Sequence, residues 1–243
     1  MSVSIVETGK FDLRRPLLIE GFPGAGLVGT IAANFIVDKL QMEPLGHITS
    51  THFTPLVAIH NSRPLHPARI YKSRKHNLIV LFSELVVPLP AIHELAKELL
   101  AWKEKHKVRQ IISLGGINIK GELGTVYGVA STPELGKFME SKGVKLVREG
   151  ATTGVSGLLL AECATTGFPA MSLLAEAQAE FLDPNAAAMV IEKMSALTGI
   201  KLDTRELQKQ AKLIEGKMKD MFEQARGAHE SYKKYSPTET MYG

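Results

Sequence analysis

The sequence feature that most constrains the fold is a glycine-rich stretch at residues 21–29 (GFPGAGLVG). It follows a short apolar run at 17–19 and precedes a segment, 28–40, in which apolar residues recur at helical spacing. Because glycine adopts positive φ and permits close approach of the backbone, a tight turn can lead directly from a strand into a helix. The stretch therefore predicts a strand, a glycine turn and a helix as the first structural unit.

Up to residue 181, short apolar segments alternate with amphipathic ones. Residues 1–16 are expected to form a leader or an edge strand, 70–71 and 78–82 a hairpin around a basic loop, and 57–59 a strand added to one edge. Thr132 and Pro133 suit the N-cap and first position of a helix that Gly143 closes. Further strands are predicted at 17–19, 45–51, 110–114, 126–130, 145–147 and 170–174, and helices at 28–40, 90–106 and 154–164. This alternation predicts an α/β fold with a mostly parallel sheet covered on both faces.

After residue 181 the pattern changes to helices alone. Asp183 and Pro184 begin a helix that Gly199 closes, and Asp203 caps another, whose apolar stripe runs over 207–225. We expect the stripe to pack on its own domain, with a neighbouring subunit as the alternative. Residues 232–243 show no periodicity. The predicted domains are an α/β core at 1–182, a C-terminal helical segment at 183–231 and a flexible tail at 232–243.

Composition limits the classes of function. The net charge is +4, and the densest basic patch, 72–76, is short and belongs to no recognisable module, so no nucleic-acid partner is expected. No apolar run approaches the length of a membrane span, and the N-terminus lacks the pattern of a signal peptide. We therefore expect a cytoplasmic protein without a membrane partner. Cys163 is the single cysteine, which excludes an intrachain disulfide and argues against a cysteine-based metal site.

The glycine-rich stretch also matches the dinucleotide fingerprint, with Gly24, Gly26 and Gly29 at the required spacing. A dinucleotide site needs an acidic residue at the end of the second strand, where this chain has STH at 50–52. The stretch also lacks the Gly-Lys-Ser/Thr of a phosphate-binding loop. We therefore interpret the glycines as structural: Gly24 and Gly26 make the turn, and Gly29 lets the helix lie close to the sheet.

The carboxyl ends of parallel strands meet at one rim of a sheet, where ligands commonly bind. Glu84 directly follows the strand at 78–82 and could act as a base there, although the sequence assigns it no His or Lys partner. The same rim would collect His52 and residues 152–153. The residues of the candidate ligand rim are Gly24, Gly26, Glu84, Gly115 and Gly116.

No catalytic or metal-binding constellation stands out. Four histidines fall between 47 and 66, but their spacing is not that of a metal ligand set. Ser156 lies in GVSG rather than in the Gly-x-Ser-x-Gly of hydrolases, and Cys163 lies on an apolar helix face. We therefore expect a protein that is not an enzyme and that uses no metal or cofactor.

The order of several motifs is more informative than any one of them. Residues 19–29 (IEGFPGAGLVG) are followed by LVVP at 85–88, SLGG at 113–116, VYGVA at 126–130 and GVSGLL at 154–159. In this combination, over residues 15–180, the chain resembles the proteasome assembly chaperone family, and in particular its archaeal homologues. The resemblance implies a three-layer α/β/α domain similar to nucleoside phosphorylases, without an established catalytic site. The alternative is an enzyme or sensor that binds a nucleoside-like ligand at the glycine-rich rim.

The C-terminus points to the same family. Met241, Tyr242 and Gly243 fit the hydrophobic–Tyr–any motif of proteasome activators. The resemblance implies a homo-oligomer that docks these residues into pockets of the proteasome core particle α subunits, with a pocket lysine as partner of the carboxylate. It would act as an assembly chaperone homologue or as an ATP-independent activator. The competing interpretation is an ordinary disordered chain end.

Overall fold

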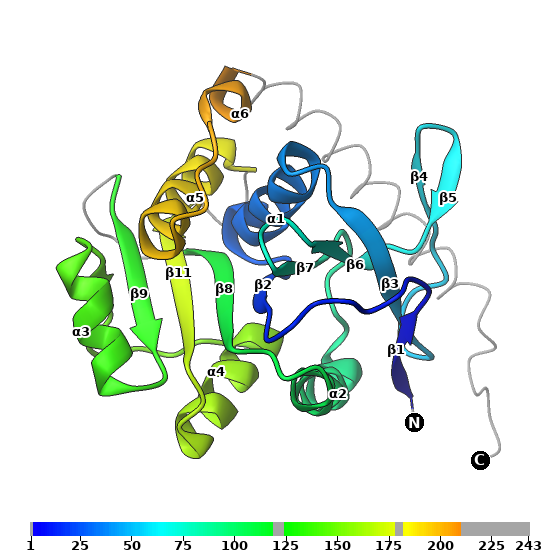
Figure 1. Cartoon of the computed structure of the whole chain (residues 1–243), viewed down its shortest axis with the longest axis horizontal. Coiled ribbons are helices and arrows are strands. Elements are labelled where there is room, and N and C mark those ends of the chain that lie inside the picture. The colour runs from blue at the N-terminus through cyan, green and yellow to red at the C-terminus, as the bar shows by residue number, and fades with distance from the viewer. Residues whose placement is uncertain (1, 119–123, 178–181, 210–243) are drawn as a thin grey trace, which may run out of the picture.

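A mixed sheet of nine strands forms the centre of the molecule in a computed structural model that describes residues 2–118, 124–177 and 182–209 (Figure 1). Across the sheet the strands are β1 (Val3–Glu7), β3 (Glu43–Ser50), β6 (Ala68–Ser73), β7 (Leu78–Ser83), β2 (Leu17–Gly21), β8 (Gln110–Ile117), β11 (Ala170–Glu176), β9 (Val126–Ala130) and β10 (Lys145–Leu146). The four central strands, from β7 to β11, are parallel, as are β9 and β10. The β1–β3–β6–β7 ladder and the β11–β9 pair are antiparallel.

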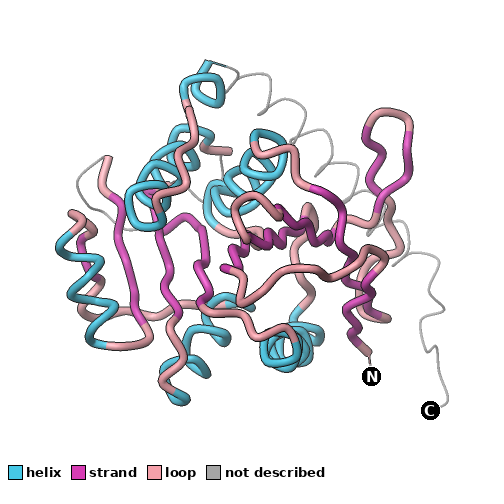
Figure 2. Tube along the Cα trace, in the orientation of Figure 1, coloured by secondary structure: helices cyan, strands magenta, loops and turns pink. Residues whose placement is uncertain are grey.

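Helices cover both faces of this sheet, which confirms the predicted α/β class (Figure 2). They are α1 (Val28–Lys39), α2 (Leu89–Lys105), α3 (Pro133–Ser141), α4 (Gly154–Thr166), α5 (Pro184–Thr198) and α6 (Arg205–Lys209). Side chains alternate between the two faces along a strand. Ile112 and Leu114 of β8 therefore pack with α1 and α5, whereas Ile111 packs with α2 and α4.

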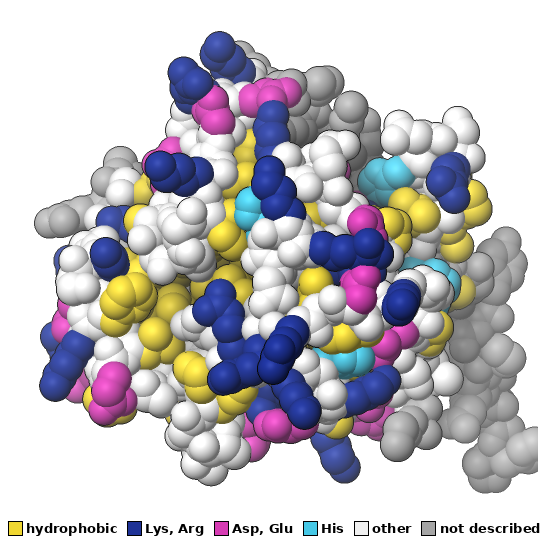
Figure 3. All heavy atoms as spheres, in the orientation of Figure 1, with side chains coloured by type: hydrophobic (Ala, Val, Ile, Leu, Met, Phe, Trp, Pro, Cys, Tyr) yellow, Lys and Arg dark blue, Asp and Glu magenta, His cyan; other side chains and the backbone are white. Residues whose placement is uncertain are grey.

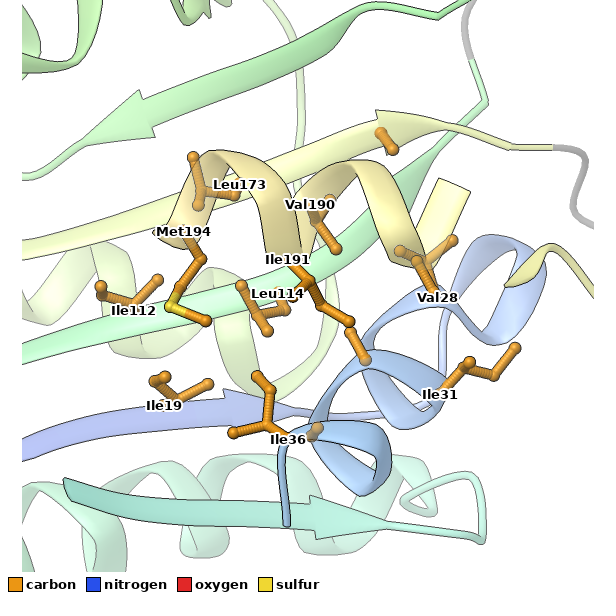
Figure 4. Packing of buried hydrophobic residues seen from close by; sticks show 14 of the residues in the cluster. Ile19, Val28, Ile31, Ile36, Ile112, Leu114, Leu173, Val190, Ile191 and Met194 are labelled. Atoms are coloured by element: carbon orange, nitrogen blue, oxygen red, sulfur yellow. The ribbon is translucent and has the colours of Figure 1, made fainter. Parts of the chain in front are cut away.

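The core beneath α1 and α5 is built almost wholly from aliphatic side chains (Figure 4). Ile191 and Met194 of α5 lie above the sheet, and Ile36 of α1 reaches the same cluster. All three side chains have no exposed surface. This packing fixes α1 on the sheet and so holds the loop that joins β2 to α1 at the rim.

The predicted first unit is present as β2, a short 3₁₀ turn η1 (Ala25–Leu27) and α1. Gly26 has φ 63°, a value that favours glycine. A Cβ on Gly29 would lie 2.3 Å from the Leu114 carbonyl oxygen, and one on Gly21 would lie 2.1 Å from the Gly29 carbonyl oxygen. Both contacts are far below van der Waals distance, so the structural interpretation of Gly26 and Gly29 is confirmed.

The predicted helix signals act as caps. The Thr132 side chain accepts a hydrogen bond from the Leu135 N–H, and Asp183 accepts one from the Ala186 N–H at 2.9 Å. Gly199 ends α5 in the left-handed conformation, with φ 77°. The predicted hairpin is also confirmed, because β6 and β7 pair antiparallel.

The expected edge strand at 57–59 is wrong in its placement. Ala58–His60 forms β4, which pairs with β5 (Arg63–Leu65) in a separate two-stranded sheet that projects from the body (Figure 1). Asn61 and Ser62 both have positive φ, 50° and 61°, as a two-residue hairpin turn requires. The neighbouring edge of the main sheet is occupied by β1, so the hairpin closes on itself instead.

Two predictions concern parts of the chain outside the described residues. The apolar stripe beyond residue 209 and the tail at 232–243 belong there, and the domain boundaries at 182 and 231 stay predictions. In the described part of the second segment, α5 packs against α1 and β11. Over the stretches that the structure describes, no helix combines the length and apolarity that crossing a bilayer requires.

Candidate functional site

A large pocket opens at the carboxyl ends of the central strands. Its volume is about 1050 Å³, and most of its wall comes from four segments, at 22–25, 86–89, 113–118 and 146–156, with further lining residues from α2, β9 and β11. The four segments are the loop from β2 to α1, the start of α2, the end of β8 and the segment that leads from β10 into α4. The chain leaves β2 and β8 in opposite directions across the sheet, and ligands of α/β proteins bind at such a switch point.

Polar side chains form a row across the sheet at this pocket. Glu20 of β2 is in register with Ser113 of β8, which is in register with Ser172 of β11, so the three share the α2/α4 face. Ser113 and Ser172 line the pocket, as does Ser156 in the first turn of α4. The pocket thus has a hydroxyl-rich inner wall, while its apolar lining includes Ile92.

Glu20 is the most unusual group in this row. It is 1% exposed, and neither carboxylate oxygen has a hydrogen-bond partner with acceptable geometry. Burial raises the pKa of Glu20 to about 7, an effect that the nearby Ser113 and Ser156 hydroxyls and the Phe22 N–H partly oppose. These donors are close enough to influence the carboxyl without forming well-aligned hydrogen bonds to it.

Two helices begin at the pocket without a side-chain cap. The residues preceding α2 and α4 are Pro88 and Thr153, and neither side chain accepts a hydrogen bond from its helix. By contrast, α3 and α5 are capped by Thr132 and Asp183. Residues at the start of both helices line the pocket. The backbone donors at its wall belong chiefly to α4, because Pro88 and Pro90 have no N–H and the Ala91 N–H donates to the Pro88 carbonyl.

The predicted rim residues separate in the structure. Gly24, Gly115 and Gly116 line the pocket, together with 152–153. Gly26 lies behind the turn, where an added Cβ would meet Ala177 at 2.8 Å. Glu84 and the expected His52 are not among the residues that form the pocket wall.

Glu84 instead belongs to a buried ion pair. The Arg69 guanidinium donates to both carboxylate oxygens, at 2.7 and 3.0 Å, and the His60 ring lies 2.9 Å from Oε1. Arg69 comes from the adjacent strand β6, and His60 comes from the β4–β5 hairpin. The cluster therefore ties the projecting hairpin to the main sheet.

The remaining candidate groups take structural positions. Among the described residues, no group of three or more His, Cys, Asp or Glu could hold a metal ion. The His47 and His66 rings stack at 3.7 Å between centroids. Cys163 is fully buried, and burial raises the pKa of its thiol to about 11.

Charged side chains are mixed over the surface. On the face shown in Figure 3, Lys and Arg side chains lie among Asp and Glu side chains and gather beside α2. Two cations of the basic patch at 72–76 are paired with one carboxylate, since Asp12 accepts from Lys72 Nζ at 2.7 Å and lies 2.6 Å from Arg74 Nε.

Sequence reasoning did not select Glu20. The available signal was a single carboxylate at the end of the apolar run 17–19, directly before the glycine turn. An unpaired acid at a fully buried strand position is costly, so such a position marks a candidate site. The other predicted site, Met241, Tyr242 and Gly243, lies outside the described residues.

The fold and the pocket define an α/β protein with a site at the switch point of its sheet. Residues 18–222 match the PAC2 family, and the chain belongs to that family. A curated relative, the uncharacterized protein MJ0106 of Methanocaldococcus jannaschii, is 32% identical over 223 residues, which cover 92% of each chain.

Two solved structures from Pyrococcus furiosus are similar along nearly their whole length. PbaA, described as an archaeal homolog of proteasome-assembly chaperone, is 34% identical with a TM-score of 0.84, over 93% of this chain and 99% of PbaA. PbaB, described as an archaeal proteasome activator, is 28% identical with a TM-score of 0.76, over 90% of this chain and 98% of PbaB. This chain is therefore similar to archaeal proteasome-assembly chaperone homologues.

Proposed function

We propose that this protein binds the proteasome core particle without catalysing a reaction itself. It would act as a homo-oligomeric assembly chaperone homologue or as an ATP-independent activator. The observation that carries this proposal is the similarity to PbaA and PbaB over at least 90% of this chain. Because the similarity extends over nearly the whole of both relatives, it is not limited to one shared module.

The proposed contact is the C-terminal tail. Tyr242 would supply a large, stiff anchor with one hydroxyl for hydrogen bonding, and Met241 would pack at the mouth of the receiving pocket. The carboxylate of Gly243 would be captured by a cation of the partner, the chemistry by which other domains recognise chain ends. From Pro237 to Gly243, an extended tail would reach on the order of 20 Å.

Homo-oligomerisation is part of the proposal because one short tail binds weakly. Several tails on one assembly gain affinity through effective concentration, provided that their spacing matches the receiving pockets. In this arrangement the core at 1–182 is the body of each subunit, and the helical segment at 183–231 connects it to the tail at 232–243. The expected cytoplasmic location stays part of this proposal.

The test is peptide hydrolysis by purified archaeal core particles in the presence of the full chain or of a variant ending at Thr240. Stimulation by the full chain that disappears on truncation is the expected result for an activator. Two single substitutions sharpen the test, since the motif requires Tyr242 but tolerates any last residue. Tyr242→Ala should abolish the effect, while Gly243→Ala should retain it within about twofold.

Co-sedimentation with core particles gives a second readout. Binding without stimulation, again lost on truncation, would indicate an assembly or adaptor role. Binding that survives truncation at Thr240 would contradict tail docking, although the core particle would still be a partner of this protein. No binding by the full chain would overturn the proposed function.

A further inference from the structure

We propose that the pocket at the carboxyl ends of β2 and β8 binds a small organic ligand that presents N–H donors to the Ser113 and Ser156 hydroxyls in front of Glu20. The ligand class is an amidine or amide carried on an apolar body. This inference does not depend on proteasome binding, because it rests on residues in and behind the pocket alone.

In the part of the chain that the structure describes, the Glu20 carboxyl group is buried without hydrogen-bond partners. Its side chain is almost completely removed from solvent, and both carboxylate oxygens lack a hydrogen-bond partner among the described residues. A buried carboxylate without partners is expensive in free energy, and native proteins retain such groups mainly where they serve a function. When Ser113 and Ser156 turn their O–H groups toward the ionised Glu20, their lone pairs are left to accept from the N–H groups of a ligand such as an amidine.

Glu20 lies directly behind the polar wall of the pocket and is not itself a lining residue. Its register partner Ser113 and its neighbour Ser156 line the pocket, and Ser172 continues the row. A ligand therefore meets these hydroxyls, and Glu20 acts on it through them and through its charge. The volume, about 1050 Å³, suits a ligand of ordinary metabolite size. The hydroxyls can donate to or accept from the same ligand group, so they accommodate an amide as well as an amidine.

The rest of the pocket suits the apolar body of such a ligand. Its lining is largely apolar, with Phe22, Leu89, Ile92, Val129 and Leu174 among the contributing side chains. Such walls favour a ring or aliphatic body, and the few polar groups set its orientation. The uncapped start of α4 offers backbone N–H donors to acceptor atoms of the ligand. A simple anion is disfavoured because the ionised Glu20 would repel it.

Three probes of nearly the same shape separate these possibilities: benzamidine, benzamide and benzoate. The first is a cation with paired N–H donors, the second a neutral N–H donor, and the third an anion without N–H groups. Ligand-observed NMR at pH 8, on the full chain, should show binding of benzamidine or benzamide and weaker or no binding of benzoate. Benzamidine binding indicates a cationic natural ligand, and benzamide binding alone indicates a neutral one.

Two variants locate the interaction. Glu20→Gln keeps the shape of the side chain but removes the anion, and we expect at least tenfold weaker benzamidine binding. Glu162→Gln is the matched control, since this exposed residue of α4 does not line the pocket and the substitution removes the same charge. Its affinity should stay within about twofold of the native chain. Glu149, which does line the pocket, is the competing carboxylate: if Glu149→Gln weakens binding and Glu20→Gln does not, the proposal is wrong.

A measurement on the native chain removes dependence on the folding of a variant. Ser113, Ser156 and the Phe22 N–H face Glu20, and no histidine is among the described lining residues. Benzamidine affinity should therefore rise about tenfold from pH 6 to pH 8 as Glu20 ionises. Three results would overturn the inference. The first is a benzamidine affinity that does not change with pH, and the second is tighter binding of benzoate than of both other probes. The third is no binding of benzamidine or benzamide up to about 10 mM.

Discussion

Because Glu20 is buried, the unfolding free energy of the chain should depend on pH even when no ligand is bound. Burial raises the pKa of this carboxyl from its usual 4.5 to about 7 in the folded chain. Between these values the folded chain holds the proton more tightly than the unfolded chain does. Stability must therefore fall as the pH rises through this window, and it must level off above the folded pKa.

The size of this effect follows from the two pKa values. From pH 5 to pH 8, linkage gives a loss of about 2 to 3 kcal/mol from Glu20 alone. Other carboxyl groups also titrate at the acid end, so the native chain by itself does not isolate the effect. The Glu20→Gln variant carries no titrating group at this position and keeps nearly the same volume. Relative to the native chain, it should gain about 2 to 3 kcal/mol between pH 5 and pH 8.

Urea unfolding of both chains at the two pH values measures this difference directly. Protein concentration must be held fixed, because an oligomer gains apparent stability with concentration. An equal free-energy difference between variant and native chain at pH 5 and pH 8, within about 0.5 kcal/mol, would refute the reasoning. It would mean that Glu20 finds partners that hold its folded pKa near the unfolded value, and it would weaken the ligand argument as well.

Other predictions test the packing around the pocket. Gly29→Ala should lower the unfolding free energy by more than about 2 kcal/mol in urea titrations, because its Cβ would lie 2.3 Å from the Leu114 carbonyl oxygen. Gly24→Ala is the matched control and should stay within about 1 kcal/mol, since nothing lies within 4 Å of the added Cβ. Asp183→Ala should cost about 1 kcal/mol through loss of the α5 cap, and an unchanged urea midpoint would contradict that role. Cys163, fully buried and with its thiol pKa raised to about 11, should react with a disulfide reagent at pH 8 only after unfolding; rapid reaction of the native chain would show that the α4 core opens.

Local signals predicted the elements well, since they act over a few residues. The N-cap at Thr132, the Asp183 start and the Gly199 end of α5 are each set by backbone groups within one turn. The close packing of Gly29 also follows from the strand–turn–helix pattern. The hairpin at 58–65 was not placed correctly, because Asn61 in a two-residue turn indicates a hairpin but does not say whether that hairpin joins the main sheet.

Contacts between distant segments could not be predicted in the same way. The sequence shows that Glu84 follows a buried strand, but its partner Arg69 depends on the register of β6 against β7. Glu20 meets Ser113 only because β2 and β8 are neighbours, and their pairing spans the whole β3–α2 excursion of the chain. The electrostatic environment of Glu20 and Glu84 therefore depends on the order of strands in the sheet, which sequence patterns over a few residues do not predict.

The pocket and the tail also differ in what they require of the assembly. The pocket in front of Glu20 can hold a ligand within a single subunit, whereas tail docking gains strength from several subunits acting together. The two proposals can therefore fail independently. A coupling between them would have a thermodynamic signature: a pocket ligand that changes core-particle affinity must itself bind with changed affinity when the core particle is present. Benzamidine added to the hydrolysis and co-sedimentation experiments, with Glu20→Gln as reference, distinguishes a regulatory pocket from one that acts separately.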